Sequence, residues 1–530
     1  MNRDSALAAL DGAYDVLIIG GGATGLGAAV EAATRGYSTA LVESSDFAKA
    51  TSSRSTKLVH GGVRYLQNGD VPLVREALRE RARLRANAPH LVKELGFILP
   101  VYRWFDGPYY FAGLKAYDLL AGSSKFAPSR YVGRRKTLER LPALRRSGLH
   151  GSISYYDGQF DDARLAIALA RTATDRGASV VNYVRALRFT YHKDRIAGAI
   201  VRDEETSREY EVRARVVVNA TGIFADDVRR LDDRTSLPLL EHSRGSHLIF
   251  SRETFPGRDA LIIPKTDDGR VLFAIPWHEH VVVGTTEIKV GGALLDPAPV
   301  RSEIDYIVAH FNRYLEHPVS RTDALAAFAG LRPLVNKKNV GSTAKLSREH
   351  IVDVSASGLV TIAGGKWTTY RKMAQDTIDT AVREARLPAS TSSSAHLGLH
   401  GSTMQGSPSD DDYAAYGTDC AALRALEAQD PALHERLDPR LPYTCAEVVF
   451  AVREEMARTV DDVLSRRTRA SFLDASAAAA AAPLVAAMLA AELGRDDRWR
   501  NDQSESFRSL LASNVASYYD AVETTAAQAS

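Results

Sequence analysis

Cysteine is scarce in this chain, which has two, Cys420 and Cys445, among 530 residues. Two thiols so far apart lack the spacing of a metal site or a disulfide framework. We therefore expect buried, reduced thiols, no metal site and a cytoplasmic location. An excess of charge of one sign is also missing, because 67 Lys and Arg face 65 Asp and Glu. This balance gives no overall attraction to nucleic acid, so we expect no nucleic-acid partner.

Long apolar runs are scarce as well. The first ten residues contain Asp4 and lack the apolar core of a secretory signal. The nearest approach to the roughly 18 apolar residues of a membrane span is 475–491, a mostly alanine stretch that Pro483 breaks. Asp474 before it and Gly494 after it are typical of a helix start and stop, so we expect a helix of a soluble domain. The chain length predicts roughly two to four domains.

Glycine, in contrast, is well represented and recurs in a turn near the start of the chain, where a side chain would not fit. Residues 14–43 (YDVLIIGGGATGLGAAVEAATRGYSTALVE) are predicted to form a strand, a glycine turn, a helix and a second strand. Gly20 permits the tight turn, Gly22 lets backbone approach a pyrophosphate, and Gly25 lets the helix pack close to the strand. Glu43 follows at about the distance where a carboxylate binds ribose hydroxyls. The pattern predicts a dinucleotide site without choosing between NAD and FAD.

Later segments are predicted to return to the same nucleotide. A hydroxyl-rich loop, 51–56, follows the second strand, and a solvated loop is its alternative interpretation. Residues 60–62 (HGG) and 219–222 (NATG) bring small residues towards a large flat ligand. A strand at 359–362 leads into the turn 364–366 (GGK), which suits an anion or a flavin edge. The predicted cofactor contacts are Gly20, Gly22, Ala23, Thr24, Gly25, Glu43, Thr51, Ser52, Ser53, Gly61, Gly62, Val184, Ala220, Thr221, Gly222, Gly364, Gly365, Lys366 and Thr368.

The order of elements predicts an α/β fold built from several parts. Residues 71–95 have the spacing of an amphipathic helix that 87–89 (NAP) would break. Residues 236–340 are strand-rich and interrupt the nucleotide domain, so we expect them to cover the cofactor. The predicted division is 14–70, 150–235 and 341–385 for the nucleotide-binding domain, 71–149 and 236–340 for a substrate or cap domain, 386–412 for a linker and 413–530 for a C-terminal helical domain.

Aromatic and basic residues gather in one segment. Six aromatic residues lie between Tyr102 and Phe111, and the stretch from Lys125 to Arg146 has one acid, Glu139, among many cations. Such a segment can rest on an anionic membrane surface. The alternative is a cap over the active site with a solvated basic edge. We hypothesise a peripheral contact with the inner face of the cell membrane.

Six motifs follow one another in a characteristic order: HGGVRYL, NATG, GSH, GTT, FAGLRPL and AGGKWTTYRK. In these motifs the chain resembles the FAD-dependent glycerol-3-phosphate dehydrogenases, strongly over 14–385 and more loosely over 447–469. The resemblance implies a Rossmann-like FAD-binding domain of the glutathione-reductase or D-amino-acid-oxidase type, with an inserted strand-rich cap domain and a C-terminal helical domain. It also implies oxidation of sn-glycerol 3-phosphate to dihydroxyacetone phosphate by hydride transfer from C2 to flavin N5. Electrons then pass to a membrane quinone, or to oxygen in a related class, and a homodimer fits the family.

A phosphate-bearing substrate requires cations in its pocket, and three groups are candidates. Arg332 can bind phosphate through two parallel donors, and Lys366 adds a point charge. Arg64 with Tyr65 is the third candidate group. A surface salt bridge is the alternative for each arginine alone. Arg332 is also a candidate for stabilising the alkoxide that develops during oxidation.

Removal of the proton on the C2 hydroxyl requires a base, and His60 and His247 are both candidates. A histidine of the protein core is the alternative for one of them, and the sequence leaves open which one accepts the proton. Two residues depart from the family pattern. Glu287 stands where Asp usually follows Gly-Thr-Thr, and Trp367 stands where Leu often follows Gly-Gly-Lys.

Two other classes of protein remain as alternatives. An amine or amino-acid oxidase of the same fold would need one arginine for a carboxylate and an apolar side-chain pocket, whereas the additional cations favour phosphate. A non-enzymatic nucleotide-binding regulator would need the glycine fingerprint alone. The glycine turns that enclose the cofactor from several sides favour retained FAD over exchanging NAD.

Overall fold

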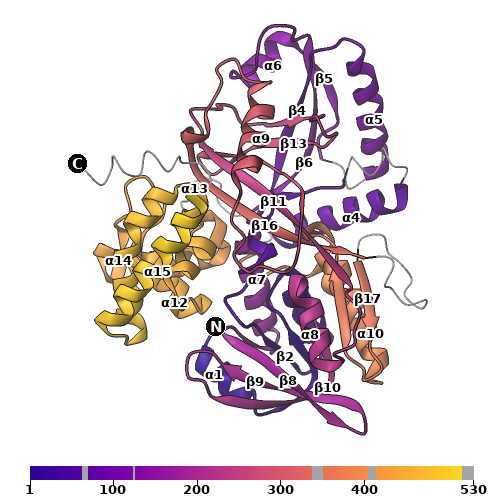
Figure 1. Cartoon of the computed structure of the whole chain (residues 1–530), viewed down its shortest axis with the longest axis vertical. Helices are drawn as coiled ribbons and strands as arrows, with labels where there is room; N and C mark the ends of the chain where they lie inside the picture. Colours follow the sequence, from indigo (N-terminus) through magenta and orange to yellow (C-terminus); the bar gives the residue numbers. More distant parts are fainter. Residues whose placement is uncertain (63–69, 123–125, 337–349, 404–412, 516–530) are drawn as a thin grey trace.

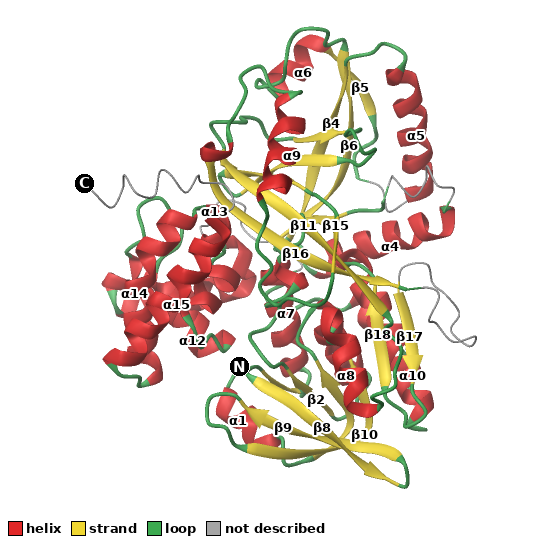
Figure 2. Ribbon diagram, in the orientation of Figure 1, coloured by secondary structure: helices red, strands yellow, loops and turns green. Residues whose placement is uncertain are grey.

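The computed structural model describes residues 1–62, 70–122, 126–336, 350–403 and 413–515. The molecule is elongated, with one sheet at the lower end of Figure 1 and a second sheet at the upper end. The two long strands β11 (Leu240–Ser251) and β16 (Ala324–Val335) run between these two ends. Figure 2 shows the C-terminal part as a group of helices packed beside the two sheets.

Eight strands form the first sheet: β1 (Ala13–Ile19), β2 (Thr39–Val42), β7 (Ser179–Val181), β8 (Val184–His192), β9 (Arg195–Asp203), β10 (Glu209–Asn219), β17 (His350–Val354) and β18 (Val360–Gly364). At its centre, β1 lies between β2 and β10 and is parallel to both. Ile19 pairs with Val42 on one side and Asn219 on the other, so three strands end at one edge. The glycine turn and NATG leave the sheet at this edge, as in a Rossmann-like fold.

Both faces of the first sheet are covered. One face carries the helices α2 (Ala23–Thr34), α7 (Asp162–Asp175) and α10 (Tyr370–Glu384). Successive residues of a strand point to opposite faces. Val16 and Ile18 accordingly pack in the core under these helices, whereas Leu17 and Ile19 pack with the meander of β8 and β9. The buried apolar run of the first strand therefore serves two cores at once.

Ten strands form the second sheet: β3 (Leu58–Val59), β4 (Val92–Val101), β5 (Arg130–Gly133), β6 (Gly151–Phe160), β11, β12 (Ala260–Ile263), β13 (Leu272–Trp277), β14 (His280–Gly284), β15 (Ile288–Val290) and β16. Helix α9 (Arg301–Asn312) packs on it through Ile304, Ile307 and Phe311. The helices α4 (Val71–Asn87), α5 (Asp106–Ala121) and α6 (Arg134–Arg140) flank this sheet.

Two features of this region bear on the sequence-based expectation. The amphipathic helix predicted over 71–95 ends at Asn87, at the predicted break 87–89, and residues 92–101 form β4, because Pro89 cannot continue a helix. Strands β3 and β6 lie in segments assigned to the nucleotide domain, yet both pair within the second sheet. The domain boundaries remain a prediction.

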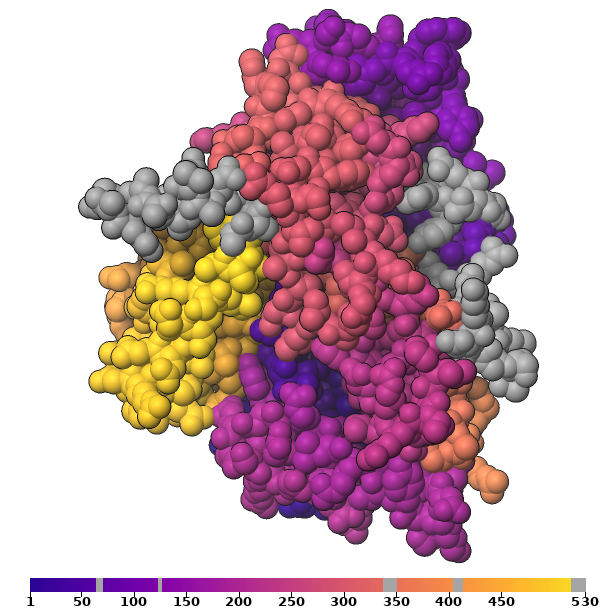
Figure 3. All heavy atoms as spheres, viewed as in Figure 1, coloured from indigo at the N-terminus to yellow at the C-terminus, as the bar shows by residue number. Residues whose placement is uncertain are grey.

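The C-terminal part is helical, as predicted, and includes α11 (Cys420–Gln429), α12 (Cys445–Glu455), α13 (Ala470–Leu473), α14 (Ala475–Leu493) and α15 (Asp497–Val515). The caps of α14 agree with the prediction, because Asp474 accepts from the N–H of Ala477 and Gly494 is left-handed at φ +62°. Pro483 interrupts the apolar run of the sequence but lies inside the helix, so the helix predicted between Asp474 and Gly494 is confirmed. By length and composition α14 is apolar enough to cross a membrane, but one of its faces packs in the core of the C-terminal lobe, yellow in Figure 3.

Candidate active site

A cavity of about 490 Å³ lies at the edge of the first sheet where β1, β2 and β10 end. Its walls come from the glycine turn, the loop after β2 and the NATG segment. Many of the predicted cofactor contacts line it, namely Gly20, Gly22, Ala23, Thr24, Glu43, Thr51, Ser52, Val184, Ala220, Thr221 and Gly222.

The glycine turn leaves no room for side chains. Gly20 has φ +111°, and a Cβ at this position would lie 2.6 Å from the carbonyl oxygen of Ala220. A Cβ at Gly25 would lie 1.9 Å from the carbonyl oxygen of Gly20. Gly22, the N-cap of α2, lines the cavity and has no side chain to cap the helix, and the N–H of Ala23 donates to the Ser52 hydroxyl at 2.9 Å. The positive end of the helix dipole favours an anion at this helix end, which fits the pyrophosphate of a dinucleotide.

The Glu43 carboxylate is held against the glycine turn. It accepts hydrogen bonds from the main-chain N–H groups of Gly21, at 2.6 Å, and Ser45, at 2.8 Å. Burial raises the pKa of Glu43, and the N–H donors partly oppose that rise. A fixed carboxylate that lines the cavity at the end of β2 suits recognition of ribose hydroxyls.

A second cavity, of about 840 Å³, is bounded by the second sheet, helix α5 and the GGK turn. It brings together His60, Arg332 and Lys366 from three distant parts of the chain, and Gly62 also lines it. The arrangement places two of the predicted cations and one predicted imidazole around one space large enough for a small phosphate ester.

Both predicted cations of this cavity, Arg332 and Lys366, have a lowered pKa. The Arg332 guanidinium donates to the carbonyl oxygen of Thr286 at 3.2 Å and to the hydroxyl of Thr285 at 3.1 Å. These neutral partners orient the arginine without cancelling its charge. Burial lowers the pKa of Arg332, and burial lowers the pKa of Lys366 to about 7. Both groups would gain from an anionic ligand, which favours their charged forms.

The two candidate histidines have different surroundings. His60 lines the second cavity, and burial, followed by the positive charge of Lys366, lowers its pKa to about 4. His247 is 1% exposed and does not belong to the lining of either cavity. Its Nε2 lies 2.9 Å from the hydroxyl of Thr56, and its ring stacks on Phe328 at 4.6 Å. Of the two, His60 is therefore the one that faces the cavity with the cations.

Comparison with known proteins agrees with this geometry. Residues 15–371 match the family described as FAD dependent oxidoreductase, and residues 360–500 match the C-terminal domain of alpha-glycerophosphate oxidase. The mitochondrial glycerol-3-phosphate dehydrogenase of Homo sapiens is 41% identical over 94% of this chain and 73% of its own length. The chain belongs to the FAD-dependent glycerol-3-phosphate dehydrogenase family.

Further members of the family extend the comparison. The mitochondrial glycerol-3-phosphate dehydrogenase of Arabidopsis thaliana is 40% identical over 96% of this chain and 88% of its own. The structure of the glycerol-3-phosphate dehydrogenase from Bacillus halodurans, complexed with FAD, superposes with a TM-score of 0.79 at 28% identity and covers 98% of each chain. The predicted fold class and FAD cofactor of this family member are thereby confirmed.

Several predicted site residues of this dehydrogenase family member lie behind the cavity walls. Thr368 accepts from the main-chain N–H of His60 at 3.1 Å, and the N–H of Gly61 donates to the Tyr117 hydroxyl at 2.8 Å. Gly25, Ser53, Gly364 and Gly365 are likewise missing from the lining of the two described cavities. Arg64 and Tyr65 lie outside the described residues.

Glu287 and Trp367, the two departures from the family pattern, lie in different parts of the structure. Glu287 lines the second cavity, and its carbonyl oxygen accepts from Arg270. Trp367 is absent from both linings. Its Nε1 donates to the carbonyl oxygen of Ser52 at 2.9 Å, and its ring packs edge-on against Phe160. Trp367 thus supports the hydroxyl-rich loop from behind.

Two features of this site are absent from the sequence-based prediction. Arg270 also lines the second cavity, beside Arg332 and Glu287, but it follows an ordinary Asp-Asp-Gly turn that carries no functional signal. Asp157 lines the same cavity and receives hydrogen bonds from Arg81 and Tyr117. This buried trio supports the HGG segment, because Tyr117 also accepts from Gly61.

Proposed function

We propose that this protein oxidises sn-glycerol 3-phosphate to dihydroxyacetone phosphate with FAD as its resident cofactor. Family membership supports this activity, and the joint presence of His60, Arg332 and Lys366 in one cavity is the observation that carries it. We infer that Arg332 and Lys366 bind the phosphate, and that Arg332 also stabilises charge developing on the C2 oxygen. The roles of Arg64 and Tyr65 remain predictions.

The reaction removes a hydride from C2 and a proton from its hydroxyl. Bound FAD supplies the hydride acceptor. We assign the proton to Nδ1 or Nε2 of His60, because this imidazole lines the cavity and its low pKa keeps it neutral near pH 7. His247 then has a supporting role behind the cavity.

A quinone is the proposed electron acceptor, with oxygen as the alternative. In support, the second cavity reaches helix α5, where Tyr109, Tyr110 and Leu114 form an apolar wall suited to a ring with an isoprenoid tail. The test is anaerobic bleaching of the flavin by glycerol 3-phosphate, followed by reoxidation. Fast reoxidation by a quinone analogue and slow reoxidation by air are expected; the reverse order would favour an oxidase, and no bleaching would remove the substrate assignment.

The same experiment separates the amine-oxidase alternative. Amino acids and amines are not expected to bleach the flavin, because several cations line the cavity, whereas a carboxylate site needs a single arginine. Dimerisation remains a prediction, which light scattering of the purified protein would measure.

We further propose a peripheral contact with an anionic membrane. Trp104, Phe105, Tyr109, Leu119 and Tyr131 are exposed, an unusual concentration of apolar side chains for a soluble surface. Exposed arginines of α6 and the neighbouring strand lie nearby in sequence. Co-sedimentation with anionic vesicles at low salt is expected, and indifference to such vesicles would contradict the contact. The mammalian relatives are named as mitochondrial, whereas for this chain a cytoplasmic location remains a prediction that fractionation would test.

A further inference from the structure

The C-terminal domain lines neither of the two cavities, as far as the chain is described. It nevertheless contacts a loop that lines the smaller cavity. The cofactor loop, residues 44–53, supplies seven wall residues of the smaller cavity: Ser44, Ser45, Ala48, Lys49, Ala50, Thr51 and Ser52. Its inner side touches the glycine turn, since the N–H of Ala48 donates to the carbonyl oxygen of Gly21. Its outer side meets residues 459–469.

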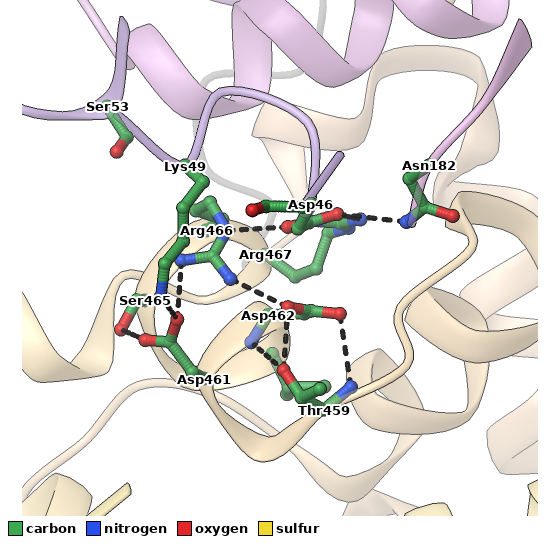
Figure 4. A network of polar contacts seen from close by, with 12 residues as sticks. Asp46, Lys49, Ser53, Asn182, Thr459, Asp461, Asp462, Ser465, Arg466 and Arg467 are labelled. Atoms are coloured by element: carbon green, nitrogen blue, oxygen red, sulfur yellow. Dashed lines mark hydrogen bonds and ion pairs between the residues drawn. The ribbon is translucent and has the colours of Figure 1, made fainter. Parts of the chain in front are cut away.

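Asp46 is the centre of this outer contact (Figure 4). Its side chain is fully buried, and it accepts from Nη1 and Nη2 of Arg467, each at 2.8 Å, and from Nε of Arg466 at 2.5 Å. Asn182 donates a further hydrogen bond at 3.2 Å. Neighbouring residues of a regular helix point in different directions, but here the π-helical turn Asp462–Arg467 lets two consecutive arginines reach one carboxylate.

Two more contacts fasten the same loop. Lys49, a wall residue of the cavity, pairs with Asp461 at 2.6 Å. Arg469 donates to the carbonyl oxygen of Ser53 at 2.8 Å. Arg466 in turn pairs with Asp461 at 2.9 Å and Asp462 at 2.7 Å, so the contacts form one connected network. Removal of one member of such a buried network leaves an uncompensated charge, which is strongly unfavourable.

We propose that Arg466 and Arg467 are positioning residues for FAD, which act by holding Asp46 and with it the cofactor loop in the conformation that binds the dinucleotide. The C-terminal domain thereby becomes part of the cofactor site without touching the cofactor. By thermodynamic linkage the effect is reciprocal. FAD binding stabilises the docked C-terminal segment by the same free energy by which the docked segment strengthens FAD binding. The inference depends on FAD binding and is independent of the substrate.

The first experiment measures the FAD dissociation constant by flavin fluorescence, with Tm measured in parallel, for full-length apoprotein. Arg467→Met should weaken FAD binding at least tenfold, and Arg467→Lys, which keeps the charge, should recover part of the loss. The matched control is Arg458→Met, because the Arg458 side chain also forms a bidentate pair between the C-terminal part and the rest of the chain, to Glu205 at 2.6 and 2.7 Å, but does not touch the cofactor loop. A lowered Tm with FAD affinity within twofold of wild type is expected for this control. Equal effects of the two methionine variants on affinity, or none for Arg467→Met, would overturn the proposal.

The second experiment needs no variant and decides the matter if Arg467→Met does not fold. Hydrogen exchange is followed in the full-length wild-type protein with and without FAD. FAD should slow exchange at least tenfold in both 44–53 and 459–469, and should leave the distant helix α15 unchanged. Slowing confined to 44–53 would contradict the coupling. Neither readout uses glycerol 3-phosphate, so a failure here is distinct from a failure of the proposed activity.

Discussion

The main-chain N–H of His60 donates a hydrogen bond to the side-chain hydroxyl of Thr368 at 3.1 Å. This contact joins the HGG segment to the GGK turn, although about three hundred positions separate them in the chain. It holds the imidazole of His60 and the ammonium of Lys366 on the same cavity. The charge of the lysine contributes to the low pKa of the histidine, so the two residues cannot be considered separately.

Replacement of Arg332 by Ala should reduce kcat/KM by about 3 kcal/mol or more in transition-state free energy, because a buried phosphate loses its charged partner. Arg332→Lys should recover only part of the loss, since it keeps the charge but not the forked donors. Steady-state kinetics with glycerol 3-phosphate measures both. An unchanged kcat/KM in Arg332→Ala would remove this residue from the site.

The pKa of Lys366, about 7, predicts a pH dependence. Burial lowers this pKa, so the free enzyme loses the positive charge as pH rises through 7, and attraction to the phosphate dianion falls with it. The value of log kcat/KM should therefore decline between pH 7 and 9. In Lys366→Arg, whose side chain stays charged, this decline should be absent; a parallel decline in both proteins would assign it to another group.

Replacement of His60 by Asn should lower kcat by on the order of a hundredfold or more, the usual effect of losing a general base. Because the pKa of His60 is about 4, its base form persists down to about pH 5, and kcat/KM should not fall between pH 7 and 5.5 on its account. His247→Asn serves as the comparison and should cost less than tenfold in kcat. A larger effect at His247 would reverse the assignment.

Replacement of Glu43 by Gln should weaken FAD binding by about 1.5–3 kcal/mol, the range for hydrogen bonds to a charged group. Titration of apoprotein with FAD measures the change. Asp15→Asn, at a partly exposed acid near the start of the neighbouring strand β1, should have no effect on FAD affinity. Full flavin retention by Glu43→Gln would count against the ribose role.

Replacement of Gly25 by Ala should destabilise the fold by about 1–3 kcal/mol and reduce flavin content, because the added Cβ would collide with the carbonyl oxygen of Gly20. Gly113→Ala is the control, since a Cβ at this position of α5 meets no atom within 4 Å. Thermal unfolding and the flavin absorbance of the purified variants report both effects. Equal Tm values for the two variants would contradict the close approach at Gly25.

Local patterns were sufficient for much of the fold. The strand Thr39–Val42, the turn at Gly20 and the caps of α14 all follow from neighbouring residues, because backbone conformation and capping depend on local sterics and hydrogen bonds. The pairing of β6 with β4, rather than with the first sheet, depends on contacts between distant segments that no local pattern encodes.

The sequence by itself determined that the chain has a dinucleotide-binding site. It also determined that the chain carries the cationic residues that a phosphate ester requires. Only the tertiary structure decided that His60 faces the cavity while His247 lies buried on Phe328, because burial is set by the packing of several elements. The same is true of Asp46, which lies more than four hundred residues before Arg466 and Arg467. An ion pair across that separation forms only after two domains have docked, so residue spacing in the sequence could not predict it.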